Sequence, residues 1–206
     1  MNYLAHAYRF LDDPQFVAGT AVPDWLAVSD RPARIRKERL DGSRLAEGIR
    51  RHVHDDAWFH ETPAFWQVSG ALTERIRALD PDPRQRAWFW GHVVTEMLLD
   101  SFLVEEDETR LERYYDALGG LDSERVQSDV TAWTTQPPVR LTGFIDRFRE
   151  AQFLRCYADD GRLLVRIGQI ARRVGLPEPS QGMLEGLPDY RRIVSGRARE
   201  LLAEPG

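Results

Sequence analysis

The chain has 206 residues, of which 42% are hydrophobic and 30% are charged, as in a globular protein with a sizeable core. Its net charge of -5 argues against a general nucleic-acid binder. No apolar run approaches the roughly 18 residues of a membrane span. We therefore expect no membrane span, no signal peptide and no nucleic-acid partner. The single cysteine, Cys156, cannot form an internal disulfide, which suits a cytoplasmic location.

Helical patterns fill almost the whole chain, and no convincing strand alternation appears. A short helix is expected over residues 2–10, and residues 16–26 should break into a loop around Pro23. Ser43 is a good N-cap for a helix that should end before Pro63. Further helices are expected over residues 64–79, across His92, Glu96 and Asp100 to the acids at 105–107, and over 109–118, 123–133, 141–157, 161–174 and 189–202. The fold class is all-α, a single-domain helical bundle with a metal-site core in residues 1–105 and supporting helices in 106–206.

Two trios of imidazole and carboxylate side chains repeat with a spacing of four residues. They are His52, Asp56 and His60, and then His92, Glu96 and Asp100. Four helical residues advance by roughly 400°, so each trio lies along one helix face. The second helix is otherwise almost entirely apolar, so its acids need cations, protons or hydrogen bonds. Two facing stripes of this kind predict a metal site on a helical scaffold.

The N-terminal region adds a histidine and a carboxylate. His6 lies in the short leading helix, and Asp24 follows an apolar stretch that contains Gly19 and Pro23. His52, Asp56, His92 and Asp100 are the expected direct ligands of a divalent Mn, Fe or Zn ion. A second set would complete another metal position, orient ligands or transfer protons; it comprises His6, Asp24, His60 and Glu96. Of these, Asp24, His60 and Glu96 are the candidate catalytic residues.

Four blocks of sequence together resemble the acyl carrier protein phosphodiesterase family. They are the Asn-Tyr-Leu-Ala-His stretch after Met1, the element from Gly19 to Asp24, the block at residues 48–56 and the block at residues 96–103. The resemblance covers about the first half of the chain. It implies metal-dependent release of 4'-phosphopantetheine from a carrier-protein serine. It also implies that His52 and Asp56 match the His and Asp of the family's motif.

The chain departs from that family at three positions, with His60 and Glu96 where Asp is usual and Ser101 where His is usual. These changes bring it closer to helical metal-dependent phosphoesterases such as zinc-dependent phospholipase C-like proteins, in which elements like Pro23-Asp24 and Gly91-His92 recur. Acyl carrier proteins are acidic, so the basic stretch at residues 31–51 would be the docking surface. A small phosphodiester, a nucleotide or a phospholipid head group is the alternative substrate.

Each motif also has a purely structural interpretation. His6 can be a helix histidine bonded to backbone, and Asp24 can cap a turn that begins at Trp25. The trios can be solvated faces or a buried hydrogen-bond network, which would make this a non-catalytic helical binding protein. His54 and Asp55 point away from the first stripe and are expected at the surface. The basic stretch can be a solvated loop and helix face.

Overall fold

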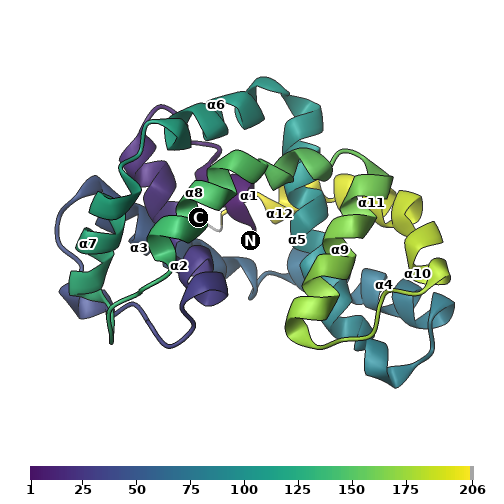
Figure 1. Ribbon diagram of the computed structural model, residues 1–206. Coiled ribbons are helices and arrows are strands. Elements are labelled where there is room, and N and C mark those ends of the chain that lie inside the picture. The colour runs from purple at the N-terminus through teal and green to yellow at the C-terminus, as the bar shows by residue number, and fades with distance from the viewer. Residues whose placement is uncertain (205–206) are drawn as a thin grey trace. The chain divides into compact units, whose positions relative to one another are not determined.

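The computed structural model describes residues 1–204, and within them the all-α fold class is confirmed. The helices are α1 (Tyr3–Ala7), α2 (Pro14–Ser29), α3 (Arg44–Phe59), α4 (Pro63–Leu79), α5 (Ala87–Glu106), α6 (Thr109–Gly119), α7 (Ser123–Trp133), α8 (Leu141–Ala151), α9 (Asp160–Val174), α10 (Gln181–Glu185), α11 (Leu187–Ser195) and α12 (Ala198–Leu201) (Figure 1). No strand forms in this part of the chain, where one isolated bridge joins Ile35 to Thr134. No described helix is long and apolar enough to cross a membrane.

The chain forms two compact units, each assembled from separate stretches. The α5 unit comprises Met1–Ala5, Ala57–Asp107 and the described residues from Leu154 onward, and the α2 unit comprises His6–Asp56 and Glu108–Phe153. Both units therefore combine helices from the expected site core at 1–105 with helices from the expected supporting half. Helix α3 supplies residues up to Asp56 to the α2 unit.

In the α5 unit, α4 and α5 run side by side and α11 packs on both (Figure 1). Gly91 of α5 makes this close approach feasible, since a Cβ there would lie 2.6 Å from the backbone oxygen of Ser69 in α4. Fully buried side chains that include Phe59, Trp90 and Tyr190 fill the core of this unit. Burial of large side chains such as these supplies the main driving force for folding.

In the α2 unit, α2 packs against α6 and α8, and α7 packs against α8. Trp25 and Tyr114 are fully buried there. Gly19 of α2 and Gly48 of α3 face each other, and a Cβ on Gly19 would lie only 2.1 Å from the backbone oxygen of Leu45. The two glycines thus allow the backbones of α2 and α3 to approach closely.

Most helix boundaries follow from local signals. The hydroxyl oxygen of Ser43 accepts a hydrogen bond from the Ala46 amide, which confirms the predicted N-cap of α3. The expected helix over 141–157 stops early because Gln152 adopts a left-handed conformation with φ 42°, which ends α8 at Ala151. The expected helix over 189–202 is divided into α11 and α12, and Gly196 ends the first of them.

The prediction of a loop around Pro23 was wrong, because α2 continues through this proline. A proline in a helix interior cannot donate to the carbonyl four residues earlier, here that of Gly19, so one helical hydrogen bond is lost. Helix α2 is buried on both sides of the proline, from Phe16 to Val22 and again at Trp25 and Leu26. We attribute the continuity of the helix to this burial, since tertiary packing outweighs a single lost hydrogen bond.

Candidate metal centre

The structure gathers six of the eight candidate residues into two groups of three. The His6 group lies in the α2 unit and comprises His6, His52 and Asp56. The His60 group lies in the α5 unit and comprises His60, His92 and Glu96. In each group the potential ligand atoms lie within 4.8 Å of one another. The prediction that the two sequence trios face each other across one metal site stays a prediction.

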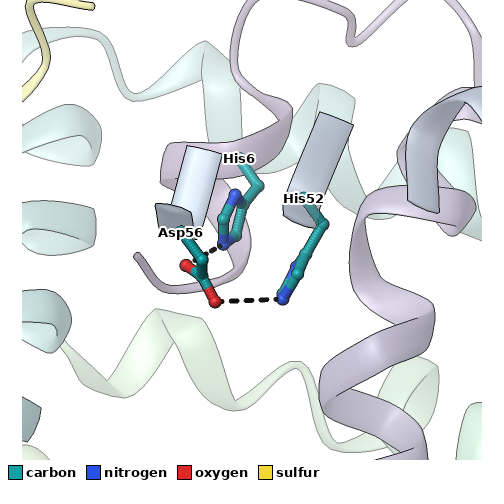
Figure 2. Close-up of side chains that lie close together, drawn as sticks. All are labelled: His6, His52 and Asp56. Atoms are coloured by element: carbon teal, nitrogen blue, oxygen red, sulfur yellow. Dashed lines mark ion pairs between the residues drawn. The ribbon is translucent and has the colours of Figure 1, made fainter. Parts of the chain in front are cut away.

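The His6 group combines a residue of α1 with two residues one turn apart on α3. Nε2 of His6 lies 3.3 Å from Oδ1 of Asp56, and Nε2 of His52 lies 3.4 Å from Oδ2 of the same carboxylate. Figure 2 shows the two imidazole rings lying face to face, with the carboxylate reaching toward both. Ligand atoms about 2.0–2.1 Å from a tetrahedral metal ion are roughly 3.3 Å apart, so these spacings suit one ion.

The orientation of His52 is set by a backbone carbonyl. Its Nδ1 lies 2.8 Å from the carbonyl oxygen of Thr20. A carbonyl can only accept, so Nδ1 must carry the hydrogen, and in the neutral ring Nε2 then holds the lone pair that faces Asp56.

The orientation of His6 is set by a residue that the sequence interpretation placed at the surface. Asp55 is only 1% exposed, and its Oδ2 lies 3.2 Å from Nδ1 of His6, while its Oδ1 lies 2.7 Å from Nη2 of Arg51. The surface prediction was therefore wrong for Asp55, because His6 and Arg51 pack on that side of α3. His54 is exposed as expected. The i,i+4 spacing of Arg51 and Asp55 was the signal that could have revealed this role.

The His6 group combines donor atoms that could hold a cation. The two rings stack with 4.1 Å between their centroids, so two protonated imidazoles here would repel each other. Nε2 of His6 is buried and makes no hydrogen bond. Burial opposes a charge on Asp56, yet the neighbouring His52 and His6 hold the pKa of its carboxyl well below the ordinary range. Two imidazole nitrogens and an ionised carboxylate directed at one another are a suitable donor set for a divalent metal.

Asp24 lies inside α2 rather than at a helix start, so it does not cap a turn at Trp25. Burial raises the pKa of its carboxyl, while the nearby His52 and His6 act in the opposite direction. Asp24 is thus within electrostatic reach of the His6 group, and its environment favours retention of a proton.

The His60 group joins the residue that follows α3 to one face of α5. Nε2 of His60 and Nε2 of His92 lie 3.0 and 3.1 Å from the same atom, Oε1 of Glu96. The amino group of Met1 also lies 3.1 Å from this oxygen. Burial opposes ionisation of Glu96, but the Met1 amino group and the two histidines hold the pKa of its carboxyl well below the ordinary range.

Asp100 belongs to neither group. Its two carboxylate oxygens accept the backbone N–H groups of Leu4 and Ala5, at 3.1 and 2.8 Å. These amides lie at the start of α1, where backbone donors have no partner within the helix, so Asp100 serves as a cap. Burial raises the pKa of its carboxyl to about 7, which these hydrogen bonds only partly offset.

Comparison with protein-family models, with curated proteins and with solved structures found no match. Function is therefore inferred from the geometry of the site and from the sequence motifs.

Proposed function

We propose that this protein hydrolyses phosphodiesters with the help of a divalent metal ion held by His6, His52 and Asp56. The observation that supports this most directly is the anchoring of both histidines through Nδ1, by Asp55 and by the Thr20 carbonyl. Metal-ligating histidines commonly donate the other ring N–H to a carboxylate or a carbonyl, which fixes the tautomer. A solvated polar face would not need two buried anchors of this kind.

Such an ion would polarise a phosphoryl oxygen and lower the pKa of a bound water toward neutrality. The protein would supply the orientation and the proton transfer. Asp56 would keep its negative charge opposite both histidines, since its pKa is held low. The Asp24 carboxyl, whose pKa is raised by burial, would hold a proton that it can give to the leaving oxygen.

Metal content and hydrolysis of bis-p-nitrophenyl phosphate test this proposal together. Protein purified without a chelator, from medium supplied with Mn²⁺ and Zn²⁺, should contain metal and hydrolyse the substrate. His52→Ala and Asp56→Asn should each lose most of this activity, whereas His54→Ala, on an exposed face of the same helix, should retain it. A metal-free wild type that stays inactive when Mn²⁺ or Zn²⁺ is added would favour the non-catalytic binding protein.

An acidic carrier protein is the partner class that we propose for this site. Arg34, Arg36 and Lys37 are exposed in the segment before α3. Arg50 has a structural role instead, since its guanidinium donates to the carbonyl oxygens of Leu40 and Asp41 at 2.7 and 2.9 Å. The docking surface is therefore better tested at the three exposed residues than at Arg50.

Incubation of holo acyl carrier protein with the metal-loaded protein should yield the apo form by mass spectrometry. The rate should fall steeply with salt, because exposed charges are screened over about 8–10 Å at physiological ionic strength. Arg34→Glu with Arg36→Glu should slow the reaction through weaker association, while the matched pair Arg162→Glu with Arg199→Glu should not. Intact holo carrier, under conditions where the small phosphodiester is cleaved, would assign a small substrate instead.

A further inference from the structure

The His60 group is a compact cluster of potential ligands that the proposed hydrolysis does not use. It lies in the α5 unit, whereas the His6 group lies in the α2 unit. His92 and Glu96 are one turn apart on α5, and His60 immediately follows α3. None of its residues is shared with the His6 group, so its properties can be measured separately.

The imidazoles of the His60 group are held in place by aromatic rings. The ring of Phe65 meets those of His60 and His92 edge-on, with centroid distances of 4.9 and 5.0 Å, and Phe59 meets His60 at 5.3 Å. The two imidazoles are themselves 4.8 Å apart. Packing of this kind restricts the rotamers of the histidines before any ligand binds.

Both histidines direct the same nitrogen, Nε2, at a single oxygen of Glu96. The separations of 3.0 and 3.1 Å are close to the roughly 3.3 Å between ligand atoms around a four-coordinate zinc ion. The side chains of His60 and His92 are 32% and 40% exposed, and that of Glu96 is 16% exposed. A fourth coordination position would therefore be open to water or to a small anion.

We propose that His60, His92 and Glu96 form a second divalent-metal site, of the zinc type, that is independent of the His6 group. Three protein ligands with an open fourth position are the arrangement found in catalytic rather than structural zinc sites. A metal ion must displace protons from the Nε2 atoms and compete with the Met1 amino group for Glu96. The site does not depend on the proposed hydrolysis and would exist without it.

Isothermal titration of zinc into chelator-treated full-length protein tests the proposal. The wild type should bind about two ions per chain, one in each group. His60→Ala with His92→Ala should reduce this to about one, and His6→Ala with His52→Ala should remove the other. If only the His6→Ala, His52→Ala variant loses an ion, the result would count against the His60 group without affecting the His6 group. If only the His60→Ala, His92→Ala variant loses one, it would count against the His6 group alone.

Glu96→Gln separates a metal site from a plain hydrogen-bond cluster without relying on a large truncation. Its amide oxygen can still accept from the histidines, but it lacks the charge that a zinc ligand supplies. The variant should lose about one ion while its circular dichroism stays unchanged, and Glu124→Gln, on an exposed face of α7, should lose none. Full zinc binding by Glu96→Gln and by the folded His60→Ala, His92→Ala variant would overturn the proposal.

Discussion

Nδ1 of His52 lies 2.8 Å from the carbonyl oxygen of Thr20, and this contact decides which nitrogen of the ring faces Asp56. His6 is arranged in the same way, with the buried Asp55 in place of the carbonyl. In both rings Nδ1 is anchored, so Nε2 is the atom presented to a ligand.

Asp55→Asn should weaken metal binding at the His6 group by about 10–100-fold, the usual cost of losing a residue that orients a ligand. The amide keeps the size of the side chain but loses the charge that interacts with His6 and Arg51. Zinc or manganese titration measures the change, with the exposed Asp12→Asn as a matched control. Unchanged affinity in Asp55→Asn would show that this buried acid is purely structural.

Metal affinity at the His6 group should fall as the pH is lowered. Burial lowers the pKa of His52, but Asp56 and Asp24 outweigh it, so the pKa lies above its ordinary value of 6.5. Below that raised pKa a proton occupies Nε2, and affinity should drop by about tenfold per pH unit. Asp24→Asn removes one of the two acids that raise the pKa of His52. In this variant the loss of metal affinity should therefore begin at a lower pH than in wild type. Titrations from pH 5 to pH 8 would reveal this displacement, and coincident curves would contradict it.

Asp100 should make the metal-free protein less stable as the pH rises. Its pKa is about 7 in the folded protein against an ordinary 3.8, so between these values only the unfolded chain loses the proton. Stability therefore falls with rising pH across this window and shows no further change from Asp100 above it. The free energy of unfolding of Asp100→Asn minus that of wild type should therefore be larger at pH 8 than at pH 4. Urea denaturation measures this difference, and a constant difference at all pH values would refute the assignment.

Gly19→Ala should destabilise the fold by about 1–3 kcal/mol or more, because the added Cβ would overlap the backbone of α3 at Leu45. The same shift would move Thr20 relative to His52 and weaken metal binding. Gly70→Ala is the matched control, since Gly70 lies within α4 with nothing within 4 Å of its added Cβ. That substitution should stabilise the protein by about 0.5–1 kcal/mol. Thermal unfolding of both variants distinguishes close packing from helix propensity.

The helices were largely predictable because their signals are local. Apolar periodicity, the Ser43 cap and the breaks near Pro63 and Gly119 depend only on neighbours in sequence. The pairing of His52 with Asp56, and of His92 with Glu96, followed from the i,i+4 geometry of a helix in the same way. The role of Asp100 did not follow, because its partners are backbone amides almost a hundred residues away.

The all-α class, most helix boundaries and the residue types that can bind a metal were predictable from the order of residues. Three features became evident only from the packing of distant segments: α2 continues through Pro23, Asp55 is buried while His54 is exposed, and six of the candidates form two groups. The reason is physical. Periodicity places a side chain on a helix face, but burial and tautomer depend on what packs against that face. In this protein the decisive partner of His52 is a main-chain carbonyl, which every residue carries and which no side-chain pattern can reveal.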